Sequence, residues 1–486
     1  MKKSIFKNVI YKITLNFFNL VVPLLIGPYV FRALGSEAMG RVKYGESIFK
    51  YFFIFAAFGI YQYGIREISK VKNDKEKVAK LFTSLFTISL ITNGIFLVVY
   101  LIVSKLSFGD EIIFPILIIF SLNFIFNIFY VEWINEAFES YDFITIKTII
   151  VKIIYVILLF VFVQNADDYL WFAGLLVISA ALNNIISFVY VKRKLNFDFK
   201  GLKLLSHIKP LFLVVIFLNG NILYTQLDIF MLGRFVSEKS VSFYIMSQQI
   251  MMIISMLMLS IVQVTIPRLA FLLGTQDDTA YITLIEKVAR VYFMLLFPAA
   301  VGLYIIADIG VVVYGGSEFT GAGSVLAIFS LYMILIGIDS ILSNQVIYVK
   351  NKESMLVRFI FISGVVNLLL NILFLNLGYF TPETAIGTTA FSTLLLIAME
   401  LIYIRKSLKV PFRLITTHSV KYLVFALVFF PVAYVIKQVT DGIFIQFILI
   451  IAVSVLVYAF LLIISKDEML YELLKRITSK VKRNKT

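Results

Sequence analysis

Fourteen stretches of about 20 mostly apolar residues follow one another along this 486-residue chain. A helix needs roughly 20 such residues to cross the hydrocarbon core of a bilayer. The sequence therefore predicts an all-α polytopic membrane protein with about fourteen transmembrane helices. The stretches cover 13–31, 44–63, 81–103, 112–130, 145–163, 169–191, 211–232, 241–264, 289–307, 323–348, 355–375, 384–404, 420–436 and 443–464.

Composition supports a membrane protein and narrows the chemistry. Sixty per cent of the residues are hydrophobic and only 15% are charged, whereas soluble domains average about 45–50% and about 25%. The chain has no cysteine and only two histidines. This excludes disulfides, thiolate metal sites and cysteine nucleophiles, and it disfavours a histidine metal site.

The basic residues indicate the orientation of the chain. If the amino terminus is cytoplasmic, 35 of the 44 lysines and arginines fall in the inner segments and 7 in the outer ones. Because cytoplasmic loops are enriched in these residues, both termini are expected on the cytoplasmic side. The net charge of +15 then reflects topology and attraction to anionic lipid, not binding of nucleic acid. We expect the first stretch to be retained rather than cleaved as a signal peptide.

The loops limit what the protein can do. The longest connection, 265–288, has no glycine-rich phosphate loop, so the chain carries no nucleotide-binding domain of an ATP-driven pump. The short outer loops disfavour enzymes that need a large external domain. Glu132, Glu136 and Glu139 share a helical spacing, which we interpret as a solvated helix end rather than an acid/base pair.

A weak internal repeat divides the chain. Ser36-Glu37 followed by Tyr44 recurs as Ser237-Glu238 followed by Tyr244, an offset of about six spans. We expect an amino-terminal lobe at 1–191, a carboxyl-terminal lobe at 192–404, and an extra part at 405–486 that holds two more spans and a basic amphipathic tail. The tail has the helical spacing of a surface-lying helix, with a partner-binding role as the alternative.

Two lysines lie inside predicted spans of the amino-terminal lobe. A charge at the bilayer centre costs on the order of 3 kcal/mol, so it normally faces a partner or a water-filled cavity. Lys50 has Glu46 one turn away, so a local ion pair is the alternative to lining a cavity. Lys152 has no such neighbour in sequence. Arg32, at the outer end of the first span, is a weaker candidate because an interfacial anchor explains it equally well.

The carboxyl-terminal spans carry carboxylates and amides instead. Asp228 lies in the seventh span, Asn367 and Asn371 share one face of the eleventh, and Thr388 lies in the twelfth. Such oxygens suit a sodium ion or a proton. The alternative is hydrogen bonding between helices, which asparagine and threonine commonly provide in membranes. Pro23 and Pro28 make the first span the leading candidate for a bend.

An ordered set of short motifs resembles the bacterial polysaccharide-repeat-unit flippases of the Wzx type. The motifs are Pro28 to Gly35, Arg66-Glu67-Ile68, Trp133 to Glu139 with Tyr141, Asp168-Tyr169, Asp228 with Met231-Leu232-Gly233, Pro267-Arg268-Leu269, and Pro298 with Gly302-Leu303. The resemblance implies a member of the multidrug, oligosaccharidyl-lipid and polysaccharide exporter superfamily, with two six-helix lobes around a central cavity. Its implied substrate is an undecaprenyl-pyrophosphate-linked oligosaccharide, moved from the inner to the outer leaflet by alternating access.

The resemblance also implies roles for the singled-out residues. An anionic diphosphate crossing hydrocarbon needs cationic partners, so Lys50, Lys152 and Arg32 are expected to contact it, with Arg66 and Glu67 at an inner gate. A sodium site like that of the related lipid II flippases would use Asp228, Asn367 and Asn371, with Thr388 nearby. Asn371 departs from the pattern because those relatives have a carboxylate there.

The expected protein is thus a flippase of the bacterial cytoplasmic membrane, not an enzyme, with no cofactor beyond a coupling Na⁺ or H⁺. Its partners would be the lipid-linked oligosaccharide, the bilayer and other glycan-assembly proteins. The alternatives are a cation-coupled multidrug exporter, which Lys50 and Lys152 disfavour, a membrane-embedded glycan polymerase or ligase, and a purely structural role in glycan assembly.

Overall fold

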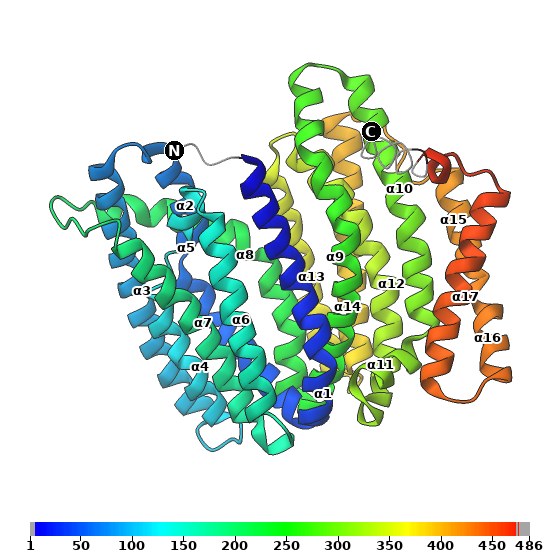
Figure 1. Ribbon diagram of the computed structural model, residues 1–486, viewed down its shortest axis with the longest axis horizontal. Coiled ribbons are helices and arrows are strands. Elements are labelled where there is room, and N and C mark those ends of the chain that lie inside the picture. The colour runs from blue at the N-terminus through cyan, green and yellow to red at the C-terminus, as the bar shows by residue number, and fades with distance from the viewer. Residues whose placement is uncertain (1–4, 473–474, 476–486) are drawn as a thin grey trace. The chain divides into compact units, whose positions relative to one another are not determined.

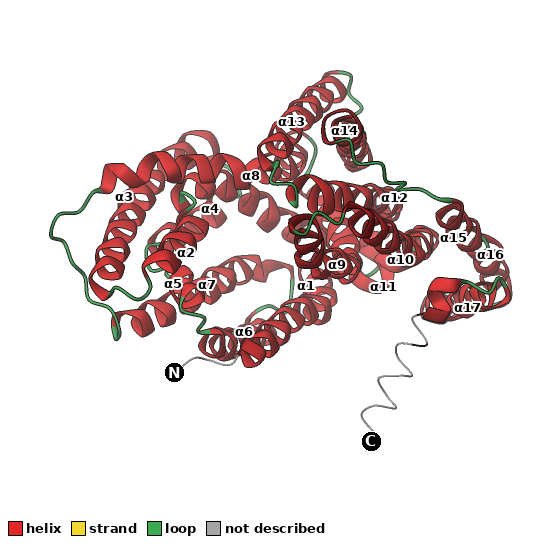
Figure 2. Ribbon diagram, turned by 90° about the horizontal axis from the view of Figure 1, so that it is seen from above, coloured by secondary structure: helices red, strands yellow, loops and turns green. Residues whose placement is uncertain are grey.

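The chain folds into helices, in agreement with the predicted class. The structure, a computed structural model, describes the backbone of residues 5–472 and 475 and the side chains of residues 7–8, 10–215, 226–472 and 475. Within this part there are helices and no strand (Figures 1 and 2). Residues 473–474 and 476–486, most of the predicted amphipathic tail, lie outside the described residues.

Two compact units divide the chain, residues 1–242 and 243–486. Unit 1 contains α1 (Ile5–Ala57), α2 (Ile60–Val71), α3 (Lys75–Phe108), α4 (Phe114–Asn127), α5 (Glu132–Ala137), α6 (Tyr141–Phe162), η1 (Ala166–Asp168), α7 (Tyr169–Lys192), α8 (Leu204–Phe235) and the first residues of α9 (Glu238–Gly274). Helix α1 packs against α3, α4, α6 and α8, and α7 packs against α4 and α6.

Unit 2 contains the rest of α9 and the helices that follow it. These are α10 (Asp278–Ile305), α11 (Ala307–Gly315), η2 (Ser317–Ala322), α12 (Gly323–Ser340), η3 (Ile341–Tyr348), α13 (Glu353–Asn376), α14 (Pro382–Tyr403), η4 (Ile404–Leu408), α15 (Thr417–Leu427), α16 (Phe429–Val439) and α17 (Ile443–Ile464). Helices α10, α12, α14 and α13 pack in succession, while α15 and α16 lie against α10 and α17 against α16 and α11 (Figure 2).

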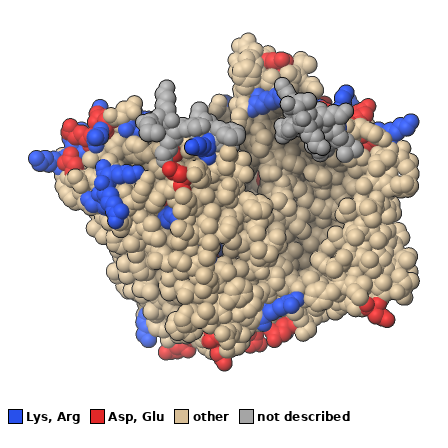
Figure 3. Space-filling view, viewed as in Figure 1, with Lys and Arg blue, Asp and Glu red and all other residues tan. Residues whose placement is uncertain are grey.

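Each of the fourteen predicted spans consists mostly of helical residues, with short breaks such as Phe58–Gly59 in the second span. In the described part, eleven helical segments are long and apolar enough to cross a membrane, and Phe114–Asn127 and Leu204–Val215 are shorter apolar helices. The first of the eleven, Ile10–Val71, contains the first two predicted spans. Charged side chains gather at the helix ends on the face shown in Figure 3, and the band between them is mostly free of charge, as the hydrocarbon core requires.

A glycine, not a proline, breaks the first helix. Gly35 has φ 70° and ψ −176° and is the residue inside α1 with non-helical torsion angles. Positive φ is accessible to glycine because it lacks Cβ. Pro23 and Pro28 lie inside the helix before this break. The break lets α1 supply the first predicted span and most of the second. Phe58 and Gly59, both with positive φ, separate α2 from α1.

Candidate functional site

Lys50 lies in a charged trio on the second half of α1. Its Nζ is 2.8 Å from Glu46 Oε1, and Lys43 Nζ is 2.7 Å from Glu46 Oε2. The ion pair foreseen as the alternative reading is therefore present. It does not neutralise the site, because two amines share one carboxylate. The Lys50 side chain also remains 40% exposed, so its role toward a substrate stays a prediction.

Lys152 lies on the helix that faces this trio. Helix α6 packs against α1, and its Tyr155 interacts electrostatically with Glu46. Residues three apart share one face of a helix, so Lys152 is on the same side of α6 as Tyr155. Lys152 is half-buried. No hydrogen bond or ion pair holds it within the described residues. Arg32 is exposed just before the Gly35 break, on the first half of α1.

Arg66 and Glu67 lie on α2, a short helix at the end of the unit that was predicted to be cytoplasmic. Arg66 Nε is 2.9 Å from Glu67 Oε1, and Lys70 Nζ binds the same carboxylate at 2.9 Å. On the buried side of α2, the Tyr63 hydroxyl lies 2.7 Å from His207 Nδ1 of α8. Helix α2 is thus fixed to α8, and its charged side is available to solvent, which leaves the gate role open.

The four residues of the predicted cation site divide between the two units. In unit 2, Thr388 of α14 donates a hydrogen bond to Asn371 Oδ1 of α13, and Thr389 donates one to Asn367 Oδ1 at 3.5 Å. Both asparagines are fully buried. Asp228 is also fully buried, on α8 of unit 1. The structure therefore brings Asn371 and Thr388 together, and the role of the group as a cation site stays a prediction.

The interpretation of Glu132 as part of a solvated helix end was wrong. The Glu132 carboxylate is buried, and Lys147 Nζ lies 3.0 Å from both of its oxygens. Ser187 and Asn135 donate further hydrogen bonds to it. The group links α5, α6 and α7. A lysine fifteen residues from a glutamate gives no periodic signal, because the pairing depends on how the helices pack.

A second contact joins α1 to the start of α9 at the opposite end of unit 1. Arg41 Nη2 is 2.9 Å from Glu238 Oε2, and the Arg41 guanidinium lies over the Tyr169 ring. The backbones approach so closely here that a Cβ on Gly40 would lie 1.7 Å from the Glu238 carbonyl oxygen. The backbones of α1 and α9 are therefore in close contact at this end of unit 1, a feature that the sequence alone did not indicate.

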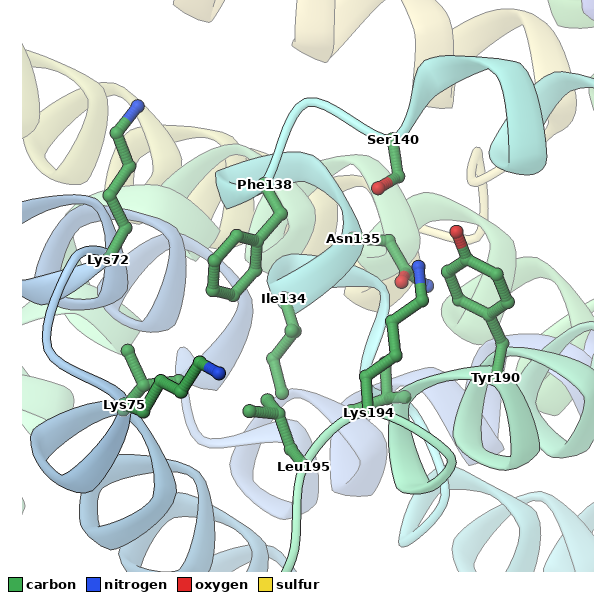
Figure 4. Close-up of a pocket in the computed structure, with 11 residues that line it drawn as sticks. Lys72, Lys75, Ile134, Asn135, Phe138, Ser140, Tyr190, Lys194 and Leu195 are labelled. Carbon is green, nitrogen blue, oxygen red and sulfur yellow. The ribbon is translucent and has the colours of Figure 1, made fainter. Parts of the chain in front are cut away.

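A pocket of about 380 Å³ opens at the predicted cytoplasmic end of unit 1. Its floor is apolar, with Ile134 and Leu195 among its lining residues, and three lysines stand at its edge. Figure 4 shows Lys75 pointing toward Ile134, Lys194 toward Asn135, and Lys72 extending away from them. Lysine amines beside apolar side chains are typical of the membrane interface, where lipid headgroups meet acyl chains.

Comparison with known sequences and structures places these features in a family. Residues 5–272, more than half of the chain, match the family described as polysaccharide biosynthesis protein. The chain belongs to this family. The match covers the trio of α1, the buried Glu132–Lys147 pair and the Arg41–Glu238 contact.

Two curated relatives, assigned the role of O-antigen transporter, match most of the chain. The protein of Shigella dysenteriae is 22% identical over 367 residues, which cover 75% of this chain and 91% of the relative. That of Escherichia coli K12 is 25% identical over 377 residues, covering 76% and 89%. The resemblance to polysaccharide flippases is thereby confirmed, as is the prediction of a transport protein rather than an enzyme.

A solved structure supports the fold over nearly the whole chain. The lipid II flippase MurJ in an inward-closed conformation superposes with a TM-score of 0.74 over 94% of this chain and 99% of that one, at 17% identity. The likeness confirms an all-helical, multi-pass membrane fold. At this identity it does not extend to individual residues.

Proposed function

We propose that this protein moves an undecaprenyl-pyrophosphate-linked oligosaccharide from the inner to the outer leaflet of the bacterial cytoplasmic membrane, for surface polysaccharide synthesis. The observation that carries the proposal is the excess of positive charge that α1 and α6 hold in two predicted membrane spans and, at Lys43, one residue before the second span. Lys43, Glu46 and Lys50 sum to one positive charge, and Lys152 on the facing side of α6 adds a second.

Such an arrangement suits a diphosphate better than a cationic drug. A diphosphate loses hydration on entering hydrocarbon, and ammonium groups replace the lost water with charge-assisted hydrogen bonds. A cationic substrate would instead be repelled. This argument favours a transporter of a lipid-linked saccharide over a multidrug exporter. It assigns diphosphate contact to Lys50 and Lys152, and also to Arg32, which precedes Lys50 on α1.

The direction of transport rests on the expected orientation, with both termini cytoplasmic. The lysine-edged pocket of unit 1 supports this orientation because anionic lipids of the inner leaflet attract basic side chains. Alternating access would open one end of the protein while the other is closed. The Arg41–Glu238 contact is our candidate for the closed outer side, and α2, with Arg66 and Glu67, for the inner gate.

The test removes the charges one at a time. In the Lys50→Ala variant the remaining Lys43–Glu46 pair is neutral, and in Lys152→Ala the amine of α6 is lost. Each variant should therefore abolish polysaccharide export while the protein still accumulates in the membrane. Lys105→Ala is a matched control, because Lys105 is an exposed lysine over the Phe114 ring at the end of α3. Normal export by the Lys50→Ala/Lys152→Ala double variant would refute the diphosphate contact.

Asn367, Asn371 and Thr388 of unit 2 and, separately, Asp228 of unit 1 are our candidates for ligands of a coupling cation. Amide, hydroxyl and carboxylate oxygens are the ligands that hard cations prefer. Asp228→Asn should weaken the dependence of export on a sodium or proton gradient. An unchanged gradient response would remove Asp228 from the site.

A further inference from the structure

A pair of carboxyl groups lies inside unit 2, away from the asparagines discussed above. Asp339 belongs to α12 and Glu400 to α14, both within predicted spans. Ser343, on the short helix η3 that continues α12, lies between them. Its Oγ is 2.9 Å from Asp339 Oδ1 and 2.5 Å from Glu400 Oε1. The two carboxyl groups also interact electrostatically.

The hydrogen bonds require a proton on one of the carboxyl groups. A serine hydroxyl has one hydrogen and can donate it to one acceptor at a time. Its second contact with a carboxyl oxygen is a hydrogen bond only if that carboxyl group is protonated and donates to Oγ. One proton, on the carboxyl group that does not accept from Ser343, therefore satisfies both contacts with Oγ.

Burial leads to the same conclusion. Glu400 has no exposed surface, and no described donor reaches its Oε2 atom. Asp339 is half-buried. Two carboxylates that share one serine hydroxyl repel each other, and burial of Glu400 removes the hydration that would stabilise its charge. An added proton removes one of the two charges.

No cation in the described part of the chain takes the place of that proton. The groups that act on the two carboxyls are each other and Ser343. The basic residues of α10 and α13 contact other groups. Arg290 of α10 binds the Tyr422 hydroxyl and Glu468. Lys287 of α10 binds Glu472, and Arg358 of α13 lies near Met355. The other charged residues on the neighbouring elements, which do not act on the pair, are Asp278, Glu286, Asp308, Glu318, Glu353, Glu383, Arg405 and Lys406.

We propose that Asp339 and Glu400 form a proton-binding site, with Ser343 as the positioning residue between them. Two carboxyls and one hydroxyl give fewer ligands than a metal cation takes, and the described residues contain no group of three acids or histidines. Loss of the proton would drive α14 away from α12 and η3. Helix η3 has π-helical hydrogen bonding, a geometry found frequently at functional sites.

The role of the proton in transport rests on the proposed flippase function. In that function, binding and release of the proton would change how α14 packs against α12 and η3 in unit 2. The site itself can be tested without transport. Infrared difference spectra of the purified full-length protein, taken between acidic and alkaline buffer, separate a carboxylic acid carbonyl band from the bands of carboxylates. The wild type should show a band that is lost in the Asp339→Asn/Glu400→Gln double variant and changed in each single variant.

Glu353→Gln is the matched control, because Glu353 is exposed at the start of α13, and this variant should keep the band. Ser343→Ala should shift the band without removing it. A band that is absent from the wild type, or unchanged in the double variant, would overturn the proposal. Loss of the band when Na⁺ replaces K⁺ at constant pH would show a sodium site instead.

A second measurement needs no variant, so it is independent of misfolding. A hydrophobic carbodiimide reacts with protonated carboxyl groups in apolar surroundings, and mass spectrometry locates the adduct. We expect the adduct on the peptides with Asp339 or Glu400, and less of it in alkaline buffer. Unlabelled peptides at both residues would contradict the proposal. Neither readout involves the saccharide, so failure of the proton site and failure of the flippase function are distinguishable.

Discussion

Breaking the buried Glu132–Lys147 pair should strongly destabilise unit 1. The side chains of Lys147 and Glu132 are only 5% and 12% exposed. Replacing Lys147 by methionine removes the charge and keeps most of the volume. The Glu132 carboxylate would then keep only the hydrogen bonds from Ser187 and Asn135.

The magnitude follows from the geometry. At the 3.0 Å separation of Lys147 Nζ and Glu132 Oε1, an effective dielectric constant of about 20 gives an attraction of about 5.5 kcal/mol. The two remaining donors offset part of the loss, so Lys147→Met should lower the free energy of unfolding by about 3–5 kcal/mol. The Glu132→Gln/Lys147→Met double variant leaves no unpaired charge and should cost about 0–2 kcal/mol.

Trp133 provides the assay, because it is buried next to Glu132 and the chain has only one other tryptophan, Trp171. In a Trp171→Phe background, the fluorescence of Trp133 reports denaturant-induced unfolding of this region. Lys72→Met is the matched control, since Lys72 and Glu139 form an exposed pair at 3.6 Å that should contribute only about 0–1 kcal/mol.

Two results would refute this reasoning. One is a Lys147→Met variant that unfolds within about 1 kcal/mol of the parent, the level expected of an exposed pair. The other is a double variant as unstable as the sum of both single variants, which would mean that the two residues act independently.

Further predictions concern packing and pH. Gly64→Ala would place a Cβ 2.5 Å from Cε3 of Trp133, so we expect a loss of about 1–3 kcal/mol and a shifted Trp133 emission, and unchanged values would contradict the close packing. Burial opposes ionisation of Asp467, but hydrogen bonds from Lys421, the Leu470 N–H and Tyr422 outweigh it and hold the pKa of Asp467 below the ordinary 3.8. The stabilisation is therefore complete above that pH and is lost as the pH falls through the lower folded-state pKa. Asp467→Asn should lower the free energy of unfolding at neutral pH by about 1–3 kcal/mol. The stability of this variant should also fall less steeply than that of the wild type as the pH is lowered. A variant whose stability falls as steeply with decreasing pH as that of the wild type would argue against this role of Asp467.

The helices could be predicted from sequence because the bilayer imposes a length and a composition on each span. All fourteen ranges consist mostly of helical residues. The bend in α1 could not be located, because prolines at 23 and 28 are tolerated in a helix whose backbone groups find other partners. The positive φ of Gly35 depends on the path that the chain takes between α1's two halves.

The candidate sites were predictable only where the partners are close in sequence. Glu46 and Lys50 are one turn apart, and the ion pair between them was foreseen. Asn371 and Thr388 were grouped from sequence as candidates for one cation site. In contrast, Glu400 meets Asp339 across 61 positions, and Lys147 meets Glu132 across a helix boundary. Such pairs depend on which faces of neighbouring helices are in contact, and a single sequence does not carry that information.

The most direct test of the flippase function is leaflet-resolved quantification of undecaprenyl-pyrophosphate oligosaccharide in cells depleted of this protein. We predict that the lipid-linked oligosaccharide accumulates on the inner leaflet and that the wild-type chain, but not the Lys50→Ala/Lys152→Ala variant, restores its transfer. Accumulation on the outer leaflet would assign the protein to a later step of polysaccharide assembly, and no accumulation on either leaflet would contradict the proposed substrate.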